Sequence, residues 1–216
     1  ALAAAATAHP LHVALHRWIH YILGLLAEWT SLEYSAEVAA AAVRLMSAQP
    51  TDAYARGCVC WTLGRVAERG PEYALHVLRV QGPAHVAEAL ALLSSHGGDA
   101  LLVACWAVGA IAQEPVGGLA LAEGCCEPLI REVLAQPDAP QLATLGLWSL
   151  SRVVACGDEC RAAVASIDGE RTIARNMILL STHPCELVAP SAEDGVMSAV
   201  GGSLAPVPSP LAATPR

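Results

Sequence analysis

Residues 105–112 read Cys-Trp-Ala-Val-Gly-Ala-Ile-Ala, and two related segments flank them at similar distances. The first is Cys-Trp-Thr-Leu-Gly-Arg-Val-Ala at residues 60–67, and the second is Leu-Trp-Ser-Leu-Ser-Arg-Val-Val at residues 147–154. Their tryptophans are 45 and 42 residues apart, and Trp18 lies 43 residues before Trp61. This period predicts stacked helical repeats rather than a closed globular domain.

The composition of the 216-residue chain also favours helices. Apolar residues make up 55%, carried largely by alanine, whereas aromatic residues make up 4% and Phe is absent. Alanine is the best helix former, and a sheet would need more β-branched and aromatic residues. The formal charge is −8 without a basic run, which argues against nucleic acid as a partner. The longest apolar stretch, Ala100 to Ala112, is too short to span a bilayer.

The cysteines lack the paired C-x-x-C spacing of a structural zinc site. Eight are present, and most lie among apolar residues of predicted helices. Cys60 and Cys105, each next to a tryptophan, are expected to pack as small hydrophobic residues, with a redox or metal role as the alternative. We expect the cytoplasm or another reducing intracellular compartment, for example a cilium, rather than the extracellular space.

Two further features recur in register with the tryptophans. Gly82, Gly124 and Gly169 lie at predicted helix junctions, where glycine can adopt the left-handed conformation, and Ser35 stands at the equivalent earlier position. Pro or Gly follows the apolar end of each next helix, which is a helix stop signal. Three aspartates, Asp52, Asp99 and Asp138, are then placed to cap the tryptophan-bearing helices.

Each unit therefore reads as a short helix, a corner, a second helix of about 12 residues and a longer helix with Trp near its middle. The clearest copy predicts helices over Glu72–Val80, Pro83–Ser95 and Ala100–Gln113. This pattern, with its glycine corner and Cys-Trp-x-Leu/Val-Gly-x-Val/Ile-Ala helix, resembles the armadillo repeat, and HEAT repeats are close in shape. The resemblance covers about Leu11 to Leu204 and implies an all-α, right-handed α-solenoid of about four armadillo-like three-helix repeats.

The expected organisation has seven segments. An Ala-rich N-terminal extension (1–10) and an N-terminal helix or cap (11–30) precede armadillo-like repeats at 31–70, 71–115 and 116–157, a degenerate repeat at 158–204, and a Pro-rich flexible tail at 205–216. The last repeat is degenerate because Glu193 stands where the period would place Trp.

The tryptophan helices suggest a candidate partner-binding groove. In armadillo proteins that carry nuclear import cargo, an Asn lies four residues after the Trp, but here the residues at that offset are Arg65, Ala110 and Arg152. The groove formed by Trp61, Arg65, Trp106, Trp148 and Arg152 would favour an acidic or extended peptide segment. In the alternative, each Trp packs between neighbouring repeats and each Arg is solvated.

The N-terminal helix carries a second candidate surface. His12, His16 and His20 are spaced to share one helix face, which could bind a metal but is better explained as a docking face together with Trp18 and Trp29. No carboxylate or Cys nearby completes a metal site, so no metal is expected. We expect this segment to cap the stack or to contact another subunit.

No catalytic motif is recognised: G-x-S-x-G, a phosphate-binding loop and H-E-x-x-H are all missing. The sequence therefore predicts a non-catalytic protein–protein interaction scaffold without a cofactor, binding a partner chain along the groove or serving as a structural subunit of a larger assembly, such as a ciliary or organellar complex. The alternative is a karyopherin-like carrier that binds short linear signals on Trp61, Trp106 and Trp148.

Overall fold

A computed structural model describes residues 8, 13–47, 51–95, 98–113, 115–136 and 139–182. These residues are almost entirely helical and contain no strand, so the predicted all-α class is confirmed for this part of the chain. The elements are α2 (Val13–Trp29), α3 (Leu32–Ser47), α4 (Ala53–Ala67), α5 (Pro71–Arg79), α6 (Gly82–Leu93), α7 (Asp99–Ile111), α8 (Pro115–Gly124), α9 (Cys126–Pro128), the π-helical turn η1 (Leu129–Val133), α10 (Pro140–Ala155), α11 (Asp158–Ala165) and α12 (Glu170–Thr182).

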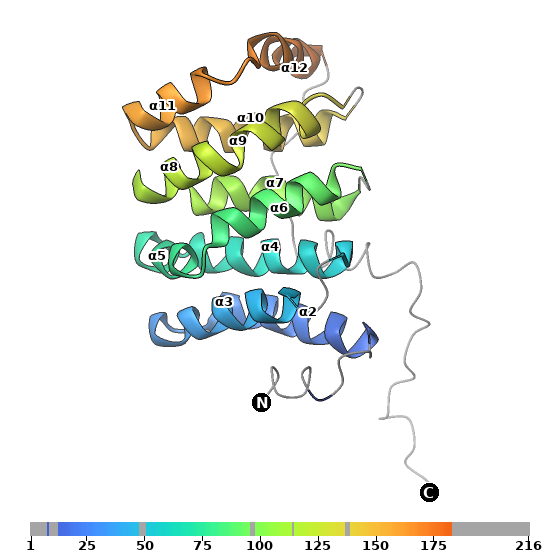
Figure 1. The fold of residues 1–216 in the computed structure, drawn as a ribbon, viewed down its shortest axis with the longest axis vertical. Helices are drawn as coiled ribbons and strands as arrows, with labels where there is room; N and C mark the ends of the chain where they lie inside the picture. The colour runs from blue at the N-terminus through green and yellow to red at the C-terminus, as the bar shows by residue number, and fades with distance from the viewer. Residues whose placement is uncertain are drawn as a thin grey trace, which may run out of the picture.

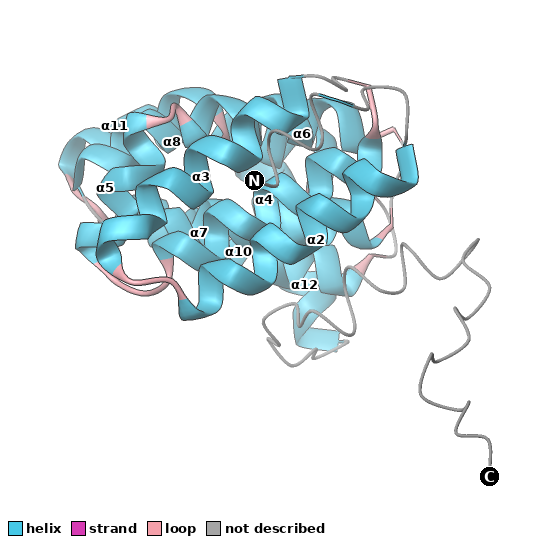
Figure 2. Ribbon diagram, turned by 90° about the horizontal axis from the view of Figure 1, so that it is seen from below, coloured by secondary structure: helices cyan, strands magenta, loops and turns pink. Residues whose placement is uncertain are grey.

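The helices lie in successive layers along the long axis of the molecule, from α2 and α3 at one end to α11 and α12 at the other (Figure 1). Viewed along that axis, α2, α7 and α10 lie on one side and α5, α8 and α11 on the opposite side (Figure 2). Helices α2, α4, α7 and α10 contact one another in this order, and we call these four helices the row. The core lies between the row and the helices that cover it, because α3 packs on α4 and α6 packs on α7.

The row helices run parallel to one another. Arg17 near the start of α2 forms an ion pair of 3.7 Å with Asp52 at the start of α4. Near the other end, Glu28 of α2 pairs at 2.7 Å with Arg65 of α4. Matching ends of α2 and α4 therefore lie together, as parallel packing requires.

The predicted aspartate caps are confirmed at one position and wrong at another. The Asp52 carboxylate accepts hydrogen bonds from the amides of Tyr54 at 2.9 Å and Ala55 at 3.3 Å, and so satisfies two free donors of α4. Asp99 instead is the first residue of α7, and Gly98 stands at the cap position without a side chain to accept. Asp138 lies outside the described residues.

Two of the corner glycines, Gly82 and Gly169, are required for close packing, and none of the three is required for a left-handed backbone. None of Gly82, Gly124 and Gly169 has a positive φ, and at the first corner the left-handed residue is Gln81, with φ 57°. A Cβ on Gly82 would approach the Val77 carbonyl oxygen to 2.8 Å. The expected conformation was wrong because the chain turns one residue earlier, at Gln81. The missing side chain of Gly82 instead leaves room for Val77 of the preceding helix.

Within the expected last unit, the described residues form α11 and α12. The remainder of the predicted degenerate repeat, the tail at 205–216 and most of the Ala-rich extension at 1–10 lie outside the described residues. None of the described helices has the combination of length and apolarity that crossing a bilayer requires.

Candidate protein-binding surfaces

Three tryptophans of the row, one each in α4, α7 and α10, pack against glycines of the preceding row helix. The pairs are Trp61 with Gly24, Trp106 with Gly64, and Trp148 with Gly109. A Cβ on any of these glycines would overlap the six-membered ring of its indole. Each glycine therefore forms a notch that lets two row helices approach closely.

Trp61 and Trp106 are buried, and Trp148 is half-buried. The Trp61 indole nitrogen is buried as well and has no hydrogen-bond partner among the described residues. The alternative interpretation, in which the tryptophans are packed rather than exposed to a ligand, holds for Trp61 and Trp106, because the preceding helix covers their rings. A role of the tryptophans in partner binding stays a prediction, and only the half-buried Trp148 still offers ring surface.

The first member of the aromatic series is Tyr21 rather than Trp18. Tyr21 lies 40 residues before Trp61 and three before Gly24, which matches the spacing of Trp61 to Gly64. Its ring stacks on Trp61 with centroids 6.0 Å apart, and Trp18 meets Tyr21 edge-on at 6.1 Å. Counting tryptophans alone misplaced this register by three residues, because the residue of α2 that is equivalent to Trp61 is a tyrosine.

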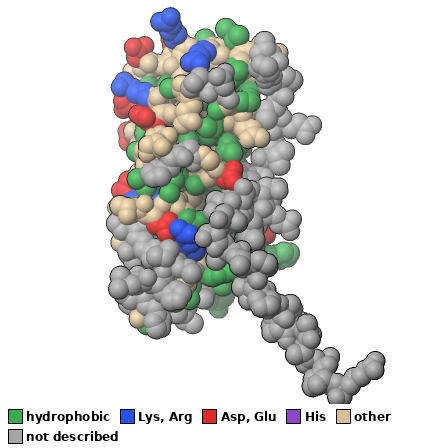
Figure 3. All heavy atoms as spheres, turned by 90° about the vertical axis from the view of Figure 1, so that its right-hand side faces the viewer, with side chains coloured by type: hydrophobic (Ala, Val, Ile, Leu, Met, Phe, Trp, Pro, Cys, Tyr) green, Lys and Arg blue, Asp and Glu red, His purple; other side chains and the backbone are tan. Residues whose placement is uncertain are grey.

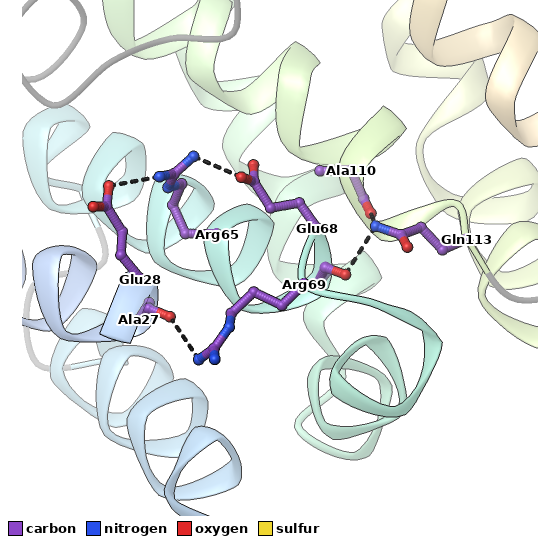
Figure 4. A network of polar contacts seen from close by, with 8 residues as sticks. Ala27, Glu28, Arg65, Glu68, Arg69, Ala110 and Gln113 are labelled. Carbon is purple, nitrogen blue, oxygen red and sulfur yellow. Dashed lines mark hydrogen bonds and ion pairs between the residues drawn. The ribbon is translucent and has the colours of Figure 1, made fainter. Parts of the chain in front are cut away.

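Arg65 is occupied by two ion pairs within the protein (Figure 4). Its guanidinium lies 2.7 Å from a Glu28 carboxylate oxygen and 2.6 Å from one of Glu68. Partial burial is the main reason that the pKa of Glu68 is raised, and Arg65 opposes this shift. The cluster of one cation and two carboxylates gives an acidic peptide no net positive charge at this point.

Arg152, the other arginine of the candidate groove, is exposed on α10. No carboxylate of the described residues lies within ion-pair distance of its guanidinium. The structure does not bring Arg65 and Arg152 into one cluster, since they lie on helices separated by α7.

Hydrogen bonds join the carboxyl-terminal ends of consecutive row helices (Figure 4). The Arg69 guanidinium donates to the Ala27 carbonyl at 3.4 Å, and the Gln113 amide donates to the Ala67 carbonyl at 2.8 Å. The Cys156 thiol lies 3.6 Å from the Ala112 carbonyl in the same arrangement. These donors satisfy carbonyls that a helix end leaves without an intrahelical partner. Sequence reasoning missed them because Arg, Gln and Cys share no motif.

The two described histidines of the predicted docking face are not exposed. His16 and His20 are buried, and both ring nitrogens of His20 have no hydrogen-bond partner among the described residues. Burial lowers the pKa of His20 to about 4, His16 adds to the shift, and Asp52 opposes it. The prediction of an outward histidine face was therefore wrong for these two residues, whose side of α2 packs inward. His12 lies outside the described residues.

The exposed face of α2 carries large apolar side chains instead. Trp18 is 44% exposed, Ile22 37%, Leu26 43% and Trp29 85%. We call these four residues the α2 stripe. Their spacing of four, four and three residues places them along one side of a helix. Trp18 and Trp29 were predicted here, whereas Ile22 and Leu26 were missed although the same spacing identifies them.

The predicted core role of Cys60 and Cys105 is confirmed, because both thiols are buried. Burial raises the pKa of Cys60 to about 12 and raises the pKa of Cys105 as well, so both stay protonated near neutral pH. Cys58, Cys60, Cys105, Cys125, Cys126 and Cys160 are free and buried, whereas Cys156 is half-buried.

Charged side chains form no single dominant patch on the visible described part of the face in Figure 3, where apolar groups lie in the middle and both signs of charge lie mainly toward one edge. Among the described residues, no group of three or more His, Cys, Asp or Glu side chains is arranged to hold a metal ion.

Comparison with protein-family models finds no matching family, and comparison with curated proteins finds no significant match.

Proposed function

We propose that the protein is a non-catalytic scaffold for protein–protein interaction, built as a right-handed α-solenoid of armadillo-like repeats. The support is the recurrence of the same contacts at one period. The Trp-to-Gly contacts and the side-chain bonds to helix-end carbonyls return every 40 to 45 residues between consecutive row helices. Repeats of this kind bury their apolar faces against neighbours, and their outer and terminal faces are left for partners.

The observation that carries the proposal is the α2 stripe. An apolar strip on an exposed helix face is typical of an interaction surface, because isolated exposed apolar residues are common but ordered rows of them are not. The chain would then act as a subunit of a larger assembly through this face of α2.

The geometry fits a carrier of short linear signals less well than it fits a scaffold. Such a carrier would need accessible indole rings at Trp61 and Trp106, and both are covered by the preceding row helix. An acidic ligand would also have to displace Glu28 and Glu68 from Arg65.

The test is affinity purification of the tagged chain from its native source, followed by reconstitution of each co-purifying protein from purified components. We expect a stoichiometric complex by size-exclusion chromatography with light scattering. Arg152→Glu tests the groove separately without breaking the ion pairs of Arg65, and we expect it to leave that complex intact. If no purified protein forms a stoichiometric complex with the chain, the scaffold function is wrong.

A further inference from the structure

We propose that Cys156 and Cys160 form a redox-active dithiol that reacts with low-molecular-weight disulfides such as oxidised glutathione. This chemistry goes beyond the proposed scaffold function and does not depend on it. Two observations carry it: both sulfurs pack against Gly118 of α8, and the two thiols differ in their exposure.

The two cysteines lie on either side of the corner between α10 and α11. Cys156 follows the last residue of α10, and Cys160 is the third residue of α11. Gly157 between them has φ 153°, a backbone conformation that favours glycine because glycine has no Cβ. Helices α8, α10 and α11 contact one another. The corner therefore brings the start of α11 and the end of α10 together over α8.

Both sulfurs lie close to one point on α8. A Cβ added to Gly118 would lie 2.7 Å from the Cys156 sulfur and 3.1 Å from the Cys160 sulfur. The two sulfurs are therefore no farther apart than the sum of these distances, and the missing side chain of Gly118 leaves the space that they occupy. A disulfide bond is about 2.0 Å long, and rotation of the two cysteine side chains supplies the remaining approach.

The two thiols differ in their access to solvent. Cys156 is half-buried, and its hydrogen bond to the Arg152 carbonyl at 3.3 Å lies at the surface. Cys160 is buried, with 2% of its surface exposed. Cys156 is therefore the thiol that meets a reagent from solution, and Cys160 reacts with it afterwards. Burial is the main reason that the pKa of Cys160 is raised, so the second reaction is the slower one.

The chemistry consists of two thiol–disulfide exchanges. The Cys156 thiolate attacks one sulfur of the small disulfide, whose S–S bond breaks and releases one thiolate, and a mixed disulfide remains on Cys156. The Cys160 thiolate then attacks the Cys156 sulfur and releases the second small thiolate. The two protein thiols are oxidised by two electrons, and the small disulfide is reduced to two thiols. The protons lost by the two cysteines are taken up by the leaving thiolates.

Oxidation acts on a contact between consecutive row helices. The Cys156 thiol lies 3.6 Å from the Ala112 carbonyl at the end of α7. A disulfide removes the S–H donor of Cys156 and joins the end of α10 to the start of α11. The redox state of the pair is thereby connected to the contact between α7 and α10.

The test is incubation of the reduced full chain with oxidised glutathione, followed by alkylation with N-ethylmaleimide in denaturant and tryptic mass spectrometry. Cleavage after Arg152 and Arg161 releases residues 153–161, which contain Cys156 and Cys160 and no other cysteine. We expect this peptide to pass through a glutathione adduct and then to carry an internal disulfide that escapes alkylation. Dithiothreitol should restore both thiols.

The same digest contains a matched control. Cleavage after Arg56 and Arg65 releases residues 57–65, which also contain two cysteines, Cys58 and Cys60. Both are buried, and burial raises the pKa of each to about 12. We expect both to stay reduced, because neither meets the reagent from solution.

Two variants separate the roles of the two thiols. Cys160→Ser should accumulate the glutathione adduct on Cys156, at least about tenfold more than the wild-type chain, because no second thiol displaces it. Cys156→Ser should leave Cys160 unmodified, because this thiol is buried. Thermal unfolding of each reduced variant checks that the fold is retained, and the mapping of the wild-type chain does not depend on either variant.

Three results would overturn the inference. The first is a 153–161 peptide that stays fully alkylated after incubation with oxidised glutathione. The second is a disulfide from Cys156 to Cys126 of α9, or to Cys185, which lies outside the described residues. The third is equal oxidation of residues 57–65 and 153–161, which would show that the reagent reacts with unfolded chain. The scaffold function is tested separately, by complex formation.

Discussion

His20 shows how burial changes the chemistry of a single residue. Its imidazole lies in the contact between α2 and the start of α4, where His16 and Asp52 are its charged or titratable neighbours. Desolvation outweighs the attraction of Asp52, so the neutral ring is favoured. The same spacing of histidines on an exposed helix would have given groups that titrate near pH 6.5.

This residue predicts a loss of stability in mild acid. The unfolded chain binds a proton at His20 below pH 6.5, whereas the native state does so only near pH 4, so stability is lost as pH falls between these values. We expect His20 to cost about 2 kcal/mol at pH 5 relative to pH 8, measured by urea unfolding. His20→Leu should remove that part of the loss and His85→Leu should not. An unchanged pH dependence in His20→Leu would contradict the assignment.

At the scale of the helix, glycines set how closely neighbouring row helices approach one another. Gly64 in α4 receives the Trp106 ring of α7, and the neighbouring pairs repeat this contact. Glycine within a helix is unfavourable by about 1 kcal/mol relative to alanine. Here the closer approach of two helices and the burial of a large ring compensate for that cost.

Gly64→Ala is expected to lower stability by about 2 kcal/mol despite its better helix propensity, because the new methyl group overlaps the Trp106 ring. The matched control is Gly124→Ala in α8, whose Cβ would make an ordinary contact of 3.9 Å with Ala87. It should be neutral or stabilising. Thermal unfolding measures both variants, and adding Trp106→Leu should reduce the cost of Gly64→Ala. Equal effects of the two alanine substitutions would refute the notch.

At the scale of the whole molecule, stability depends on contacts between adjacent layers. Helices α4 and α7 have row neighbours on both sides, whereas the α2 stripe and several residues of α12, including Met177 and Ile178, are exposed. In such an arrangement the free energy is close to a sum of layer and interface contributions, so the ends are less stable than the middle.

Hydrogen exchange should follow this order. We expect the slowest amide exchange in α4 and α7, and faster exchange toward both α2 and α12, measured by mass spectrometry on the intact chain. Uniform protection from α2 to α12 would instead indicate one globally cooperative unit.

The all-helical class, the Asp52 cap and the burial of Cys60 and Cys105 could be predicted from the sequence, because propensity, capping and apolar periodicity act over short distances along the chain. Helix termini and side-chain directions depend on contacts between distant residues. Only the tertiary structure therefore assigned Tyr21 to the aromatic series, placed Gln81 rather than Gly82 in the left-handed region, and paired Arg65 with Glu28. It also divided the residues of α2 into buried histidines and an exposed stripe, because the position of α4 decides which side of that helix is covered.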